Sequence, residues 1–69
     1  MPDTHRILRK RAVSEKTGLP HSTLYRYVAL GQFPAPIELG PKTVGWVESE
    51  VDAWLEARIT ARDEQQAAA

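Results

Sequence analysis

Near the start of the chain, a short segment with two adjacent apolar residues predicts a first short helix. It covers residues 9–17, with Ala12 and Val13 as its apolar positions. Gly18 follows directly, and glycine is the residue best able to adopt the left-handed conformation that ends a helix. The first helix is therefore predicted to stop at this glycine.

A second helix is predicted over residues 20–30, after a tight turn at Gly18-Leu19-Pro20. Pro20 suits the first helical position because the N–H that it lacks would have no partner within the helix there. Gly31 ends the segment, and the prolines that follow it disfavour helical geometry in the residues before them. One apolar stripe at helical spacing runs along this helix and consists of Leu24, Tyr27, Val28 and Leu30.

Two short runs with partial alternation of apolar and polar residues, at 37–39 and 44–47, predict a small β-hairpin. Between them, Gly40-Pro41-Lys42-Thr43 has the composition of a turn and carries a basic residue at its tip. From Glu48 onward, apolar residues at positions i, i+3, i+4 and i+8 predict a third helix. These positions are Val51, Trp54, Leu55 and Ile59.

The first two predicted helices pair as a helix-turn-helix, because two helices joined by a short glycine-containing turn form that motif. Ser14 is small enough to let the helices approach each other. The fold class that follows is mainly α, with three helices and a small β-hairpin. Apolar residues that lock the helix pair are predicted to be Val13, Leu19, Leu24 and Tyr27.

Length and composition point to one compact domain. The chain has 69 residues, of which 42% are hydrophobic, enough for a single core and too few for a second. We expect a flexible N-terminus over residues 1–7, a domain over residues 8–62 and a frayed or disordered tail over residues 63–69. The chain has no cysteine, and it lacks the apolar run of a signal peptide or membrane span. We therefore expect a cytoplasmic protein.

Charge is segregated along a chain whose formal net charge is zero. Residues 1–45 carry seven Lys or Arg against three acids, whereas residues 46–69 carry two against six. Such segregation allows one electropositive face on a neutral molecule, and local potential steers an anionic partner more than total charge does. The same pattern also fits two ordinary solvated surfaces.

The exposed face of the second helix is predicted to carry groups that can read DNA. Arg26 is a candidate for a bidentate contact to a guanine edge, and His21 or Ser22 for a contact to a base or a phosphate. Tyr25 is a candidate hydrogen-bond donor to phosphate. An exposed arginine or a basic run is also commonly just solvated. Candidate phosphate clamps flanking the helix are Arg9, Lys10, Arg11 and Lys42.

Catalytic and metal chemistry have little support in the sequence. His5 and His21 lie far apart and have no cysteine or carboxylate companions at ligand spacing. No acid or oxyanion-hole pattern accompanies His21-Ser22, and no glycine-rich phosphate loop is present. We expect no enzyme activity, no metal and no cofactor.

An ordered succession of short motifs spans residues 6–59. It consists of Thr17-Gly18-Leu19, Ser22-Thr23-Leu24-Tyr25-Arg26, Gly31-Gln32-Phe33-Pro34-Ala35-Pro36, Gly45-Trp46 and Glu48-Ser49-Glu50-Val51-Asp52-Ala53-Trp54-Leu55. In this succession the chain resembles the AlpA-like prophage transcriptional regulators, a branch of the winged helix-turn-helix group that includes MerR-type regulators and phage excisionases. One departure falls at Pro20 and His21, where similar proteins commonly show a polar capping residue and a basic residue.

The resemblance implies a winged helix-turn-helix fold. The second helix would enter the major groove of double-stranded DNA, and the hairpin, residues 37–46, would touch the backbone or the adjacent minor groove. Lys42, with Thr43 beside it, is then the expected wing contact. The recognition-helix contacts implied by the resemblance are Ser22, Thr23, Tyr25 and Arg26.

Two classes of function follow from the sequence. The first is a sequence-specific DNA-binding transcription regulator of phage or prophage type, with an excisionase-type factor that bends DNA as a near variant. The second is a protein-interaction module that uses the acidic third helix and exposed parts of Trp46 or Trp54. Partners expected for the first class are double-stranded DNA, further copies of the chain bound cooperatively on DNA, and integrase or RNA polymerase. Strong dependence of duplex binding on salt favours the first class.

Overall fold

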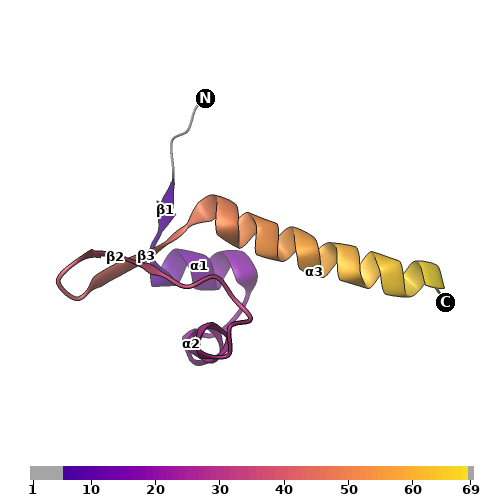
Figure 1. Ribbon diagram of the computed structural model, residues 1–69, viewed down its shortest axis with the longest axis horizontal. Coiled ribbons are helices and arrows are strands. Elements are labelled where there is room, and N and C mark those ends of the chain that lie inside the picture. The colour runs from indigo at the N-terminus through magenta and orange to yellow at the C-terminus, as the bar shows by residue number, and fades with distance from the viewer. Residues whose placement is uncertain (1–5, 69) are drawn as a thin grey trace.

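The computed structural model describes residues 6–68, and the side chains of residues 6–66 (Figure 1). Within this range the chain forms three helices and a three-stranded antiparallel sheet, which confirms the predicted mainly α fold with a small hairpin. Expectations for residues 1–5 and Ala69 lie outside the described part. The elements in chain order are β1 (Ile7–Leu8), α1 (Lys10–Thr17), α2 (His21–Ala29), β2 (Ile37–Gly40), β3 (Thr43–Val47) and α3 (Glu48–Ala68).

The sheet has the strand order β1-β3-β2, so the strand that precedes α3 lies in the middle. Ile7 pairs with Val47 and Leu8 with Trp46, and the N–H of Glu48 donates to the carbonyl of Arg6 at 2.7 Å. Ile7, which was expected to belong to a flexible N-terminus, is paired in this strand. A strand of two residues is too short to show an alternating pattern in the sequence. It forms because it pairs with β3, which lies far along the chain.

The β2–β3 hairpin is drawn close to β1 at Gly45. A Cβ added to this glycine would lie 2.5 Å from Cγ2 of Ile7 and 3.1 Å from Cδ1 of Leu39. Ile37 pairs with Gly45 and Glu38 with Val44, and the register then shifts before Gly40. The absence of a side chain at Gly45 therefore lets residues from both neighbouring strands close over the central one.

Glycine ends both helices of the predicted pair. Gly18 has φ 76° after α1, and its N–H donates to the carbonyl of Ser14 at 2.8 Å. After α2, Gly31 has φ 73° and donates to Val28, while Gln32 donates to Tyr27 at 2.8 Å. This pair of bonds is the Schellman arrangement, which satisfies carbonyls that the last turn would leave free.

The start of α2 differs from the prediction by one residue. Pro20 is not the first helical residue but precedes the helix in an extended conformation, with φ −64° and ψ 158°. Its carbonyl still accepts the first helical hydrogen bond, from the N–H of Leu24 at 3.0 Å. The fixed φ of proline fits both conformations, so only ψ, which the ring does not restrain, distinguishes them.

The core draws one or more side chains from every helix, from β3 and from the loop after α2. Two apolar residues of the predicted helix stripes lie outside it, since Leu30 is 58% exposed and Ile59 is 42% exposed. The indole N–H of Trp46 donates to the carbonyl of Pro34 at 2.9 Å, which satisfies the one polar group of that buried side chain. The buried residues are Val13, Leu24, Phe33, Trp46 and Val51.

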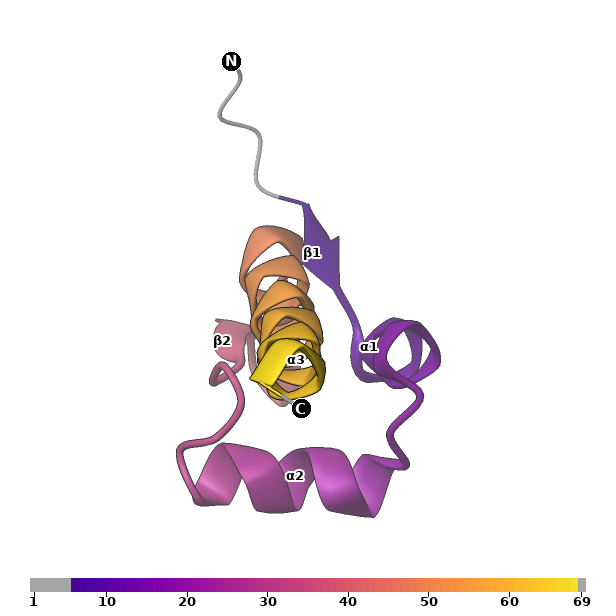
Figure 2. The same ribbon diagram turned by 90° about the vertical axis from the view of Figure 1, so that its right-hand side faces the viewer.

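Helix α3 extends well beyond the core. In Figure 1 it leaves the domain on the side opposite to the tip of the hairpin, and Figure 2 shows α2 crossing beneath it. Residues 56–66 are all exposed. Residues 63–68, which were expected to belong to a frayed or disordered tail, are the last turns of this helix. Their alanine, glutamine and glutamate residues favour a helix, and propagation from an existing helix needs no new nucleus.

None of the helices in residues 6–68 combines the length and apolar character that crossing a membrane requires.

Candidate nucleic-acid interface

Hydrogen bonds at the turn fix α1 to α2. The hydroxyl of Ser14 donates to the carbonyl of Leu19 at 2.5 Å. The hydroxyl of Thr17 donates to Val13 at 2.8 Å and accepts from the N–H of Leu19 at 3.3 Å. Val13 and Leu24 are fully buried where the two helices meet the core. The predicted helix-turn-helix is therefore a packed unit, which sets the direction in which the outer face of α2 points.

The outer face of α2 carries four of the five side chains of this helix that were predicted to contact DNA. His21, Ser22, Tyr25 and Arg26 are exposed, whereas Thr23 is only partly exposed. His21 and Arg26 take part in no ion pair among the described residues. Their polar groups are thus free to meet base edges or phosphates.

A groove joins this face to the start of α1 and to the hairpin. Its volume is about 320 Å³. The start of α1, helix α2 and the hairpin meet there, although they are distant in sequence. The cations of the groove lie on the residue before α1, on α1 itself and on the hairpin turn. We call it the basic groove; its lining consists of Arg9, Lys10, Arg11, Tyr25, Lys42 and Val44.

Tyr25 forms the aromatic wall of the basic groove. Its ring centroid lies 6.4 Å from that of Trp46, with an interplanar angle of 54°. The Tyr25 ring also contacts Lys10, whose Nζ lies 5.7 Å from the ring centroid, within the range of a cation–π interaction. Tyr25 is still 44% exposed, so the ring connects α1, α2 and β3 while remaining accessible to a ligand.

Two residues of β3 that were not predicted as part of the site lie near Tyr25: Val44 lines the basic groove, and the buried Trp46 contacts the Tyr25 ring. Both lie on β3 with one residue between them, so they share one face of the sheet. That spacing was visible in the sequence, but the residue across from them, Tyr25, could not be identified until α2 was placed against β3.

Lys42 occupies an unusual backbone conformation at the tip of the hairpin. Its φ is 57°, in the left-handed region that favours glycine. The neighbouring Thr43 is partly buried, and its hydroxyl donates to the carbonyl of Pro41 at 3.1 Å within the turn. Of the two predicted wing contacts, Lys42 therefore lines the basic groove and Thr43 stabilises the turn that presents it.

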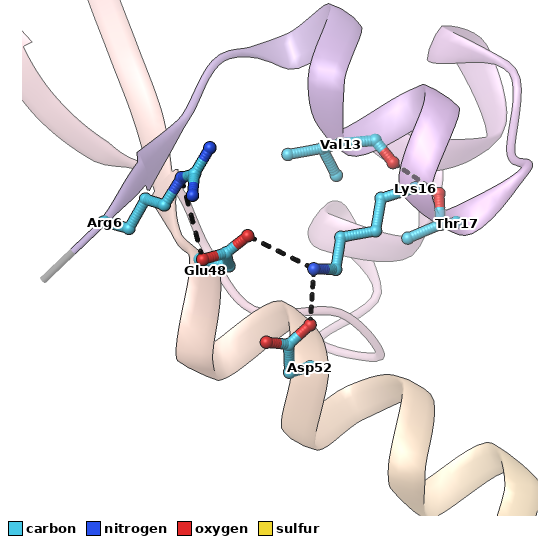
Figure 3. Close-up of polar contacts among 6 residues, drawn as sticks. All are labelled: Arg6, Val13, Lys16, Thr17, Glu48 and Asp52. Carbon is cyan, nitrogen blue, oxygen red and sulfur yellow. Dashed lines mark hydrogen bonds and ion pairs between the residues drawn. The ribbon is translucent and has the colours of Figure 1, made fainter.

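Cations on the opposite side of α1 are neutralised within the molecule (Figure 3). The Nζ of Lys16 lies 3.2 Å from Glu48 and 2.7 Å from Asp52, and Arg6 lies 3.8 Å from Glu48. Hydrogen bonds to Asp52 and then Glu48 raise the pKa of Lys16 above its ordinary value of 10.5. Two of the acids at the start of α3, Glu48 and Asp52, thus contact Lys16 on α1, and Glu48 also contacts Arg6 before β1.

The basic groove keeps its positive charge, apart from one pair. Arg11 lies 3.6 Å from Glu15 on the same helix, and both side chains are largely exposed. Arg9, Lys10 and Lys42 make no ion pair with any carboxylate of the described residues. The segregation of charge along the sequence therefore becomes a separation in space.

A helix-turn-helix whose second helix is exposed, flanked by a β-hairpin that presents a cation, defines a winged helix-turn-helix domain. The sequence model of the family described as "Prophage CP4-57 regulatory protein (AlpA)" matches residues 6–59. The chain belongs to this family, which confirms the resemblance noted from its motifs.

Two relatives show how far the similarity extends. The DNA-binding transcriptional activator AlpA of Escherichia coli (strain K12) is 46% identical over 61 residues, which cover 77% of this chain and 84% of that protein. The uncharacterized protein ORF88 of Enterobacteria phage P4 is 42% identical over 64 residues, which cover 90% of this chain and 73% of that protein.

Proposed function

We propose that the protein is a small DNA-binding transcription regulator of phage or prophage type. Helix α2 enters the major groove, and the β2–β3 hairpin lies against the adjacent backbone. The observation that carries this proposal is the basic groove, where unpaired cations from α1 and the hairpin flank the exposed face of α2. Membership of the AlpA family supports it, since a relative is named as a DNA-binding transcriptional activator.

Sequence is read by the outer face of α2. Arg26 is exposed and unpaired among the described residues, so its guanidinium is available for a bidentate contact to guanine. Ser22 and His21, nearer the start of the helix, contact a base or a phosphate. Thr23, which is partly buried, makes a smaller contribution than the resemblance implies.

The alternative of an interaction module that uses the acidic α3 is not favoured. Glu48 and Asp52, in the first turns of that helix, are occupied by Lys16. Trp46 is fully buried, and the indole N–H of Trp54 donates to the carbonyl of Gln32 at 2.7 Å. Four of the groups on which that alternative relied, Glu48, Asp52, Trp46 and the indole N–H of Trp54, are therefore used within the domain.

The test is a fluorescence-anisotropy titration with duplexes from the DNA around the protein's own gene. It compares the wild-type protein, Arg26→Ala and the control Arg62→Ala at two salt concentrations. We expect selective binding that weakens as salt rises, loss of selectivity in Arg26→Ala, and no change in Arg62→Ala, because Arg62 lies on the projecting part of α3. Binding no stronger to these duplexes than to random duplex would contradict the proposal.

Recognition of a long operator needs more than one copy of the chain. A single DNA-binding module buries only about 600–1,000 Å² on DNA, which limits the number of base pairs that it reads. Copies therefore bind repeated or paired sites, in the cytoplasm where phage or prophage DNA lies. Titration of duplexes carrying one site or two sites tests this, and equal affinity per site would contradict cooperative assembly.

A further inference from the structure

The lysine that lines the basic groove on α1 has a fixed aromatic support. The Nζ of Lys10 lies 5.7 Å from the centroid of the Tyr25 ring. Behind that ring stands Trp46, which is fully buried and is tied through its indole N–H to Pro34. A lysine side chain loses considerable rotamer freedom when it is held in one place. Support by the Tyr25 ring reduces that loss on binding, because the ammonium already lies over the groove.

The second lysine of the groove is also held in place, by its backbone. Lys42 has φ 57°, a conformation in which residues other than glycine and asparagine are uncommon. Strain of this kind persists where the surrounding structure imposes it, and it gathers at binding sites. The hairpin turn thus fixes the backbone from which the Lys42 side chain starts, and Lys42 lines the same groove as Lys10.

The chemistry of the groove fits a phosphodiester. Its polar lining is cationic or phenolic, and Tyr25 adds a hydroxyl donor beside Lys10. A volume of about 320 Å³ is many times the roughly 10–15 Å³ that one water molecule needs on the same measure, which leaves room for a phosphate group. The site lies where the start of α1, the hairpin turn and α2 meet, beside the face of α2 that is proposed to enter the major groove.

We propose that the basic groove is a preformed site for a backbone phosphate of DNA, bound by Lys10 and Lys42, in which Tyr25 is a positioning residue for Lys10. The proposal rests on the proposed function and gives the basic groove and α2 different roles in DNA binding. The groove supplies affinity that does not depend on sequence and fixes the register of α2, whereas Arg26 and its neighbours on α2 supply the choice of sequence.

The phosphate contacts are tested by the salt dependence of binding. Affinities of the wild-type protein, Lys10→Gln and Lys42→Gln are measured on cognate and random duplexes at several salt concentrations. Each phosphate contact contributes about 0.9 to the magnitude of the slope of log affinity against log salt. We expect each substitution to lower that magnitude by about 0.9 on both duplexes, with the ratio of cognate to random affinity unchanged.

Arg58 provides a matched control. Its guanidinium carbon lies 5.7 Å from the centroid of the Trp54 ring, so it is also a cation over an aromatic ring, but on α3. Arg58→Gln removes the same charge and is expected to leave the slope unchanged. Slopes in Lys10→Gln and Lys42→Gln equal to that in Arg58→Gln would overturn the phosphate site.

The positioning role of Tyr25 is tested by a double-mutant cycle with Lys10. Lys10→Gln lowers the affinity for DNA in both backgrounds. We expect the loss to be about two- to fivefold larger in the wild-type protein than in Tyr25→Leu, which lacks the aromatic ring. Tyr25→Phe keeps the ring and should restore the full effect of Lys10→Gln. An effect of Lys10→Gln that is equal in the Tyr25→Leu and wild-type backgrounds would overturn the positioning role.

The outcomes separate this inference from the proposed function. If the wild-type protein binds no duplex selectively, the proposed function fails. If it binds selectively but the Lys10 and Lys42 variants keep the wild-type slope, only the phosphate site fails. Tyr25 is 44% exposed, so its variants are expected to fold, which thermal melting verifies. The Lys10 and Lys42 measurements do not depend on them.

Discussion

The Nζ of Lys16 on α1 lies 2.7 Å from Oδ1 of Asp52 on α3 and fastens the helix-turn-helix to the last helix (Figure 3). Glu48 binds the same ammonium group at 3.2 Å and also faces Arg6. A single exposed ion pair contributes little to stability, but a network of several charges contributes more. Here the cluster connects three segments that are far apart along the chain.

Lys16 is expected to give stability that disappears at alkaline pH. Its pKa is raised above 10.5 by hydrogen bonds to Asp52 and Glu48, so the folded protein holds the proton more tightly than the unfolded chain. The stabilisation is fully present below 10.5 and is lost as pH rises through the higher pKa of the folded state.

Thermal melts of the wild-type protein and Lys16→Gln, recorded as a function of pH, check this. The variant should melt at a lower temperature at neutral pH, and the difference should shrink above pH 10.5. Arg62→Gln is the control, because Arg62 pairs only with the adjacent Asp63 among the described residues. A difference between wild type and Lys16→Gln that does not vary with pH would contradict the assignment.

Gly45 is expected to tolerate no side chain. Its missing Cβ would meet Cγ2 of Ile7 at 2.5 Å and the carbonyl oxygen of Leu8 at 3.3 Å, and the backbone atom cannot move away without disturbing β1. Gly45→Ala should lower the free energy of unfolding by about 1–3 kcal/mol, as overpacking does. Urea denaturation measures it. Gly40→Ala is the matched control, since nothing lies within 4 Å of its added Cβ, and equal losses in both variants would contradict the steric explanation.

Local patterns were sufficient to predict the helices, the hairpin and the exposed face of α2. Gly18 and Gly31 marked the helix ends because left-handed backbone needs a residue without a side chain. The turn at 40–43 was recognisable from its glycine and proline, although its left-handed residue is Lys42. Each of these features depends on residues only a few positions apart.

Features that depend on distant residues were not predictable. Strand β1 exists because Ile7 meets Val47, and the wall of the basic groove exists because Tyr25 meets Trp46. Periodicity also overestimated the core: Ile59 continues the stripe of α3 but lies 42% exposed, since α3 has left the domain by that point. A helical stripe indicates which face is apolar and not how far the partner surface extends.

The projecting part of α3 is expected to be dispensable for folding. Residues 56–66 are all exposed, and the last ion pair there, between Arg62 and Asp63, joins adjacent residues. A chain that ends after Thr60 should unfold with a free energy within about 0.5 kcal/mol of the full chain. Trp54→Phe is the comparison, because it removes the hydrogen bond to Gln32 and should cost about 1 kcal/mol. A larger loss on truncation than in Trp54→Phe would show that the projecting turns support the core.

Lys42 is expected to show opposite effects on stability and DNA binding. Its φ of 57° is unfavourable for lysine, whereas asparagine adopts this region more readily. Lys42→Asn should therefore raise the free energy of unfolding by up to about 1 kcal/mol, while loss of the charge weakens DNA binding.

A second variant separates the two effects of replacing Lys42. Lys42→Gln removes the same charge but is no better suited than lysine to a positive φ. Both variants should therefore lose affinity for duplex DNA to a similar extent, and only Lys42→Asn should gain stability. Urea denaturation and anisotropy titrations on the same preparations measure the two quantities. If Lys42→Asn gained no stability over Lys42→Gln, the positive φ of residue 42 would not lower the stability of the wild-type protein, and the hairpin turn would be unstrained with lysine at its tip.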